Sequence, residues 1–203
     1  MKYLLTLSVL TLLIPLALSQ RIKKLSPDAY VNWCSSPDFA WKNKDTLNGI
    51  TYAVRFVPDQ YDIAKCALSR CETKEVLLND LNSKDKFGSF VLDLACLEFS
   101  KDLFSYPSQT GMNAAERKIY LSNLIKEDLI GISRSNDTIR CTSVIYETNI
   151  PTRARVIFEL EKSNAPITKL VFTDRMINNS LIEFSIPELT KKNIPDLNLK
   201  KYE

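Results

Sequence analysis

Four segments in the last third of the chain decide its fold: TIRCTSVIYE (138–147), RARVIFELE (153–161), ITKLVF (167–172) and LIEFSI (181–186). They are rich in β-branched and aromatic residues, and the first two alternate between apolar and polar side chains, as strands with one buried face do. Runs that contain Asn, Pro or Ser separate the four segments and predict turns. Strands joined by such short turns pair side by side, so the region predicts a C-terminal four-strand antiparallel meander.

A helix is predicted before these strands. Asn113 fits the N-cap position, and Glu116 stands three residues later, where the second partner of a capping box belongs. Apolar residues then recur at helical spacing to about residues 126–129, and Gly131 fits a helix exit. A shorter helix is expected over 72–81, where acidic residues precede a short apolar face.

The first half of the chain has a less regular pattern. After the turn sequence Asn48-Gly49, apolar and polar residues alternate and predict a strand over 47–57. Residues 61–71 fit either a helix or a strand.

The apolar segment 87–104 also fits two interpretations. Alternate residues from Phe90 to Cys96 are apolar, as in a strand, but an apolar helix face fits the same residues. We expect a helical turn through Leu94 and an extended stretch from Cys96, followed by a loop at 106–111.

Together these elements predict an α+β fold in which a bent antiparallel sheet packs against helices. The segment VLLNDLNSKD (76–85) resembles the end of the first helix of the nuclear-transport-factor-2-like fold and the turn that follows it. The segment NAAERKIYLSNL (113–124) resembles a later helix of that fold. The resemblance covers about half of the chain and implies a cone-like sheet around an apolar interior. It also implies that some members catalyse reactions with an acidic residue and a tyrosine in the pocket. The residues available for those roles here are Asp93, Glu98, Tyr120 and Tyr146.

A lipocalin is the rival interpretation. LNGITY (47–52) is similar to the opening strand of that family, but Thr51 stands where the family's tryptophan is expected. A lipocalin would also place its eight strands before its main helix, whereas the predicted helix here precedes the four clearest strands. Either fold encloses a concave apolar surface, which suits a small apolar ligand.

The first nineteen residues predict a secretory signal peptide. Lys2 precedes a short apolar run, Pro15 interrupts that run, and Ala17-Leu18-Ser19 places small residues before a cleavage site at Gln20. The run is short for a membrane anchor, which needs about 20 apolar residues. The mature protein is therefore expected to be secreted and extracellular, without a membrane span.

Composition shifts divide the chain into five predicted parts. They are a signal peptide (1–19), a polar leader (20–29), a cysteine-containing N-terminal segment with one strand (30–71), a core domain of helices and meander (72–187) and a flexible tail (188–203).

The five cysteines are disulfide candidates because an exported chain meets an oxidising compartment. They are Cys34, Cys66, Cys71, Cys96 and Cys141. Their spacing contains no C-x-x-C pair, so a thiolate zinc site or a thioredoxin-like centre is not expected. We expect Cys96 to approach Cys141 across the core and Cys34 to pair with Cys66 or Cys71.

Two sequons are candidates for N-glycosylation. They begin at Asn136, between the predicted helix and the first late strand, and at Asn178, in the last predicted hairpin turn. Both fall on turns of an exported chain, so we expect at least one of them to be used.

What the chain lacks excludes most familiar chemistry. It has no histidine, which excludes Ser-His-Asp and Cys-His catalysis and every zinc site that uses histidine. It has four glycines and a net charge of +3, which argue against a phosphate-binding loop and against nucleic-acid binding. We therefore expect no catalytic residue, metal or cofactor, and a secreted, disulfide-stabilised binding or interaction module whose partner is a protein or a small apolar ligand. The alternatives are a lipocalin-like carrier and a pocket isomerase or hydratase.

Overall fold

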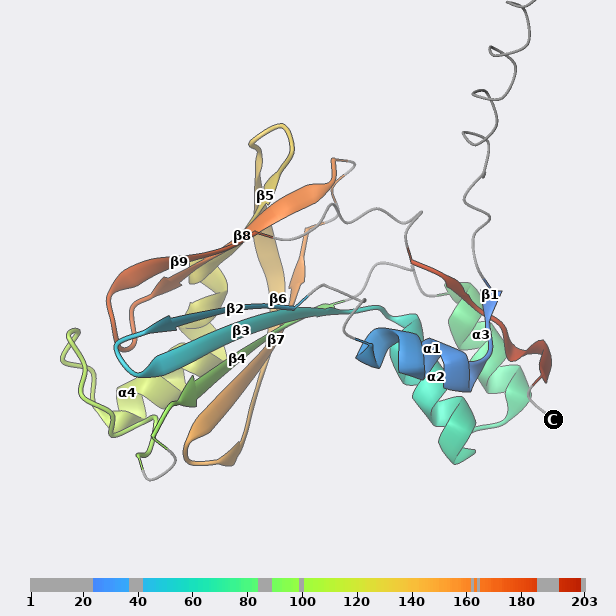
Figure 1. Ribbon diagram of the computed structural model, residues 1–203, viewed down its shortest axis with the longest axis horizontal. Helices are drawn as coiled ribbons and strands as arrows, with labels where there is room; N and C mark the ends of the chain where they lie inside the picture. The colour runs from blue at the N-terminus through green and yellow to red at the C-terminus, as the bar shows by residue number, and fades with distance from the viewer. Residues whose placement is uncertain are drawn as a thin grey trace, which may run out of the picture.

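The computed structural model describes residues 24–36, 42–83, 89–98, 101–161, 163, 165–185 and 194–201. An antiparallel sheet of eight strands curls nearly into a barrel, and a group of helices lies beside it (Figure 1). The prediction of an α+β protein with an antiparallel sheet is therefore confirmed. The predicted signal peptide lies outside the described residues.

The strands of the sheet follow the order β2-β3-β4-β7-β6-β5-β8-β9, and all neighbours are antiparallel. Their bounds are β2 (Lys42–Leu47), β3 (Ile50–Val57), β4 (Ser89–Cys96), β5 (Leu129–Ser133), β6 (Thr138–Ile150), β7 (Arg153–Leu160), β8 (Ile167–Asp174) and β9 (Ser180–Ser185). The two edge strands, β2 and β9, approach each other, and the Asn43 side-chain amide donates to the Ser185 carbonyl at 2.7 Å. We call this junction the β2–β9 seam.

The C-terminal meander is not confirmed, because β7 and β8 are not neighbours. β8 pairs with β5, and β5 also pairs with β6. The residues of β5 include Gly131, which the sequence suggested as a helix exit. They alternate instead between buried and half-buried positions, as an inserted strand does.

A bulge in β6 changes which of its side chains enter the core. The register shifts between Cys141 and Ser143, so Cys141 shares the interior with Val144 and Tyr146. Ile145, which strict alternation would place with Cys141, is 60 % exposed on the outer face.

β4 is a continuous strand, so the expected helical turn through Leu94 is wrong. It pairs with β3 on one side and with β7 on the other. Phe90, Leu92, Leu94 and Cys96 are all buried in the main core. Phe90 packs between Phe56 and Phe158, with ring centroids 5.3 and 5.5 Å away.

The predicted strand over 47–57 corresponds to β3, and the sequence missed β2 before it. Asn48 and Gly49 form the two-residue turn between them, both with positive φ (48° and 78°). Two such residues are what a type I′ hairpin turn requires. β2 and β3 belong to the main sheet, so the predicted boundary at residues 71/72 does not separate a core domain from its N-terminal segment.

The helix predicted from Asn113 is confirmed. It comprises α4 (Ala114–Ile119), the π-helix η1 (Tyr120–Leu124) and the 3-10 helix η2 (Ile125–Asp128). Both hydrogen bonds of the predicted capping box are present.

The remaining helices form a second core with the two ends of the described chain. This part comprises β1 (Lys24–Leu25), α1 (Pro27–Ser35), α2 (Gln60–Ser69), α3 (Lys74–Ser83), β10 (Asp196–Leu197) and the 3-10 helix η3 (Leu199–Lys201). β1 pairs in parallel with β10, and Leu25, Leu197 and Leu199 are buried among the helices.

Two predicted boundaries need correction here. Lys24 and Leu25 of the predicted polar leader form β1, and the flexible tail is wrong for 194–201, because the apolar residues there are buried. Within the described residues, no helix combines the length and the hydropathy needed to cross a bilayer.

Candidate functional site

A surface hollow of about 380 Å³ lies between α4–η1 and the loop that precedes α4. It is lined by Thr110, Gly111, Met112, Glu116, Ile119, Tyr120 and Leu124. Its volume falls in the range of small-molecule sites, roughly 300–1,000 Å³.

The helical side of the hollow exposes two large apolar residues. Ile119 is 56 % exposed and Leu124 is 50 % exposed, whereas Tyr120 between them is only 2 % exposed. The π-helix contains both Tyr120 and Leu124. Such turns are rare and occur frequently at functional sites.

The loop side is held by the turn between β8 and β9, residues 175–179, which we call the β8–β9 turn. The Met176 carbonyl accepts hydrogen bonds from the hydroxyls of Ser108 (2.9 Å) and Thr110 (3.0 Å). The backbone N–H of Gln109 donates to the Ile177 carbonyl at 2.8 Å. The loop therefore has a fixed position although it has no regular secondary structure.

The helical side is held by the same region. The Tyr120 hydroxyl lies 2.9 Å from Asp128 Oδ2 and 3.1 Å from the carbonyl of Thr173. Arg175 pairs with Asp128 at 3.0 Å. Burial raises the pKa of both the Tyr120 hydroxyl and the Asp128 carboxyl, the latter despite the opposing effects of Tyr120 and Arg175.

Arg117 joins the two sides of the hollow. Its guanidinium donates to the carbonyls of Leu103 (2.9 Å) and Met112 (3.2 Å), and the residue is 3 % exposed. Burial lowers its pKa. This cation supports the wall from behind and is not among the residues that line the hollow.

Asp174 fixes the β8–β9 turn. This fully buried carboxylate accepts the backbone N–H groups of Met176 (2.9 Å), Ile177 (3.0 Å) and Asn178 (3.0 Å) and the hydroxyl of Tyr52 (2.5 Å). Carboxylates of Asp commonly organise turns in this way. Both sides of the hollow thus depend on the end of β8 and the turn that Asp174 organises.

Comparison with known proteins identifies no relative of this chain. No family model matches the chain, and neither does a curated protein or a solved structure.

Of the four pocket candidates named from the sequence, only Tyr120 lies at this hollow. Asp93 pairs with Arg155 at 2.6 Å on the outer face of the sheet, where the two line a smaller hollow of about 140 Å³. Glu98 pairs with Lys101, and Tyr146 is half-buried against the main core. The sequence missed Asp128 and Asp174, although an Asp at the start of a predicted turn was a usable indication for Asp174.

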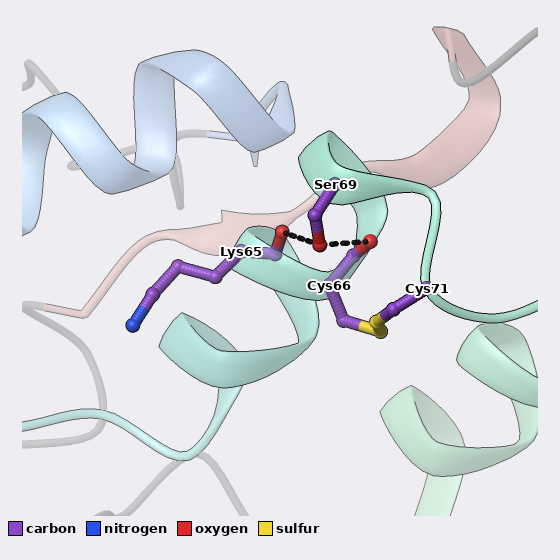
Figure 2. Close-up of a disulfide and its surroundings, with 4 residues drawn as sticks. All are labelled: Lys65, Cys66, Ser69 and Cys71. Atoms are coloured by element: carbon purple, nitrogen blue, oxygen red, sulfur yellow. Dashed lines mark hydrogen bonds between the residues drawn. A yellow bond between two sulfur atoms is a disulfide. The ribbon is translucent and has the colours of Figure 1, made fainter.

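A disulfide joins Cys66 to Cys71 at the C-terminal end of α2 (Figure 2). Their Cα atoms are 5.3 Å apart, within the usual range. The Ser69 hydroxyl donates to the carbonyls of Lys65 (3.0 Å) and Cys66 (3.2 Å) in the same turn. The bridge closes the end of α2 before α3 begins.

The other expected pairings are wrong, because Cys34, Cys96 and Cys141 carry free thiols. Ala95, the residue before Cys96, pairs with Arg153 at one end of β7. Cys141 pairs with Leu160 at the other end of that strand. Seven residues of strand span about 23 Å, too far for a bridge. Burial raises the pKa of Cys34 to about 12 and that of Cys141 to about 11, which disfavours the reactive thiolate.

The two sequons occupy very different environments. Asn136 is exposed in the turn between β5 and β6, so its use stays a prediction. Asn178 is 3 % exposed, and its side-chain nitrogen donates to the Tyr52 hydroxyl at 2.6 Å. A sugar on that nitrogen would displace Tyr52, so we expect no glycan at Asn178 in the folded protein.

Metal binding finds no support in the part of the chain that the structure describes. That part holds no group of three or more His, Cys, Asp or Glu side chains that could share an ion.

Proposed function

We propose that this chain is a secreted, disulfide-stabilised binding module without catalysis, which holds an apolar ligand in the hollow at α4–η1. The observation that carries this proposal is the exposure of Ile119 and Leu124 on one wall of a single hollow. Covering apolar surface contributes roughly 25 cal/mol per Å². A ligand that covers both side chains therefore gains free energy without a rearrangement of the core.

The side chains of the hollow favour binding over chemistry. The Tyr120 hydroxyl points to Asp128 and the Thr173 carbonyl, and Asp128 pairs with Arg175. Asp93 and Glu98, the acids considered for a pocket enzyme, lie in exposed ion pairs. A conversion of substrate that Tyr120→Phe abolishes would favour the isomerase or hydratase alternative instead.

The module is tested with 1-octanol, an uncharged probe that is small enough for the hollow. In ¹⁵N-labelled protein, we expect 1-octanol to shift the amide signals of Met112, Ile119 and Leu124. The double variant Ile119→Asp, Leu124→Asp is expected to bind it about tenfold more weakly, which corresponds to about 1.4 kcal/mol.

Ile145→Asp is the matched control, because Ile145 is equally exposed but lies on the outer face of β6. Its affinity for 1-octanol should stay within a factor of two of the unmodified protein. Equal losses in both variants, or signals that do not move in the unmodified protein, would contradict the proposed site.

Secretion rests on the first nineteen residues, and the Cys66–Cys71 disulfide supports it because such bonds persist in oxidising compartments. N-terminal sequencing of the exported protein is expected to show a chain that begins at Gln20. An exported chain that retains Met1 would rule out the predicted cleavage.

The likeness to the nuclear-transport-factor-2-like fold, with its cone-like sheet, stays part of this proposal. Its support is a strongly curved sheet with α4 packed beside it (Figure 1). A lipocalin-like carrier remains the alternative, since the edge strands of the sheet nearly meet.

A further inference from the structure

We infer that the hollow selects apolar ligands that carry a positively charged group, with an alkylammonium as the simplest example. The inference rests on the proposed function, because it specifies the ligand of the same hollow. It follows from where the charged side chains of α4 are directed.

Glu116 is the charged residue among those that line the hollow. It lies three residues before Ile119 and four before Tyr120, so the three share one face of the helix. Its Oε2 atom accepts the backbone N–H of Asn113 at 2.8 Å, which fixes the carboxylate at the rim. An alkyl chain on Ile119 would therefore have its head group within reach of this carboxylate.

The neighbouring cations do not neutralise Glu116. Arg117 is buried and donates to two backbone carbonyls. The Lys118 ammonium lies over the Phe104 ring, 5.4 Å from its centroid, and Arg175 pairs with Asp128. Among the described residues no ion pair involves Glu116, so none of their side-chain cations competes with a ligand cation there.

Three probes with the same alkyl chain and different charges test this selectivity: octylamine, 1-octanol and octanoate. Each is titrated into the ¹⁵N-labelled full chain at neutral pH, and the amide shifts of Met112, Ile119 and Leu124 give the affinities. Octylamine should bind about two- to fivefold more tightly than 1-octanol, the range for a solvent-exposed ion pair, and octanoate more weakly. Raising the salt concentration to 0.5 M should reduce the difference.

Glu116→Gln is the decisive variant, because Gln also fits the last position of a capping box and so preserves the start of α4. It should bring the ratio of the octylamine and 1-octanol affinities, both measured in this variant, close to one. Glu159→Gln, an exposed position on β7, is the control and should retain the advantage.

Equal affinities for octylamine and octanoate would overturn the inference while the apolar site stands. The same holds if the advantage of octylamine survives in Glu116→Gln. If none of the three probes shifts the signals of the hollow, the proposed function fails and the inference fails with it.

Discussion

Asp174→Ala should lower the free energy of unfolding by about 4 kcal/mol, one of the two largest effects expected from a single substitution in this chain. The carboxylate is fully buried and accepts three backbone N–H groups and the Tyr52 hydroxyl. Its removal leaves four buried donors without their acceptor. Urea unfolding followed by circular dichroism measures the loss.

The same substitution should also weaken the binding of 1-octanol, because the turn that Asp174 organises positions Ser108 and Thr110. Tyr52→Phe provides a milder variant in case Asp174→Ala fails to fold. It removes one hydroxyl from the network and should cost about 1–2 kcal/mol. Asp93→Ala is the control for loss of an exposed carboxylate, with an expected cost below about 1 kcal/mol. Similar losses for Asp93→Ala and Asp174→Ala would contradict the structural role of Asp174.

Phe90→Ala is expected to cost about 3–5 kcal/mol, for a different reason. The ring is 1 % exposed and packs between Phe56 and Phe158, so truncation leaves a cavity in the main core. Phe90→Leu retains most of the volume and should cost about 1 kcal/mol. Both variants are measured by urea unfolding.

Phe90→Ala should leave the hollow unchanged, in contrast to Asp174→Ala. Phe90 lies six residues, or about 20 Å, from Cys96, which is the end of β4 next to the Asn48-Gly49 turn. It is this end of β4 that lies near the β8–β9 turn, because Asn48 bonds to Asn178. The variant should therefore bind 1-octanol normally under conditions where it remains folded. A matching loss of affinity in both variants would show that the hollow responds to global stability and not to the β8–β9 turn.

Local patterns predicted the local elements of this fold. The capping box of Asn113 and Glu116 lies within one turn of helix, so sequence alone identified it. The turn at Asn48-Gly49 was recognisable because few residues accept positive φ at both positions. α3 and five of the eight strands of the main sheet were found for similar reasons.

Elements that depend on pairing across the sheet were missed. The residues of β4 fit both periodicities, and only its pairing with β3 and β7 makes it a strand. Gly131 suggested a chain break, but it lies within β5, where an added Cβ would come 2.8 Å from Leu160 Cδ1. A larger residue there would require the Leu160 side chain to shift.

The site was predictable only in part. Tyr120 was a candidate only through the resemblance to the nuclear-transport-factor-2-like fold, which implied a catalytic tyrosine, and it lines the hollow. The turn that Asp174 organises is local, but its hydrogen bond to Tyr52, 122 residues earlier, was not predictable. Contacts this distant are set by sheet topology, which the predicted meander had wrong.

The β8–β9 turn connects two features that are otherwise far apart along the chain. On one side it positions the hollow through Met176 and Ile177, and on the other Asn178 bonds to Tyr52 and Asn48 beside the β2–β9 seam. The same turn therefore contacts both the loop side of the hollow and the closing edges of the sheet. If closing the seam strengthens ligand binding, then a bound ligand stabilises the closed seam by the same free energy.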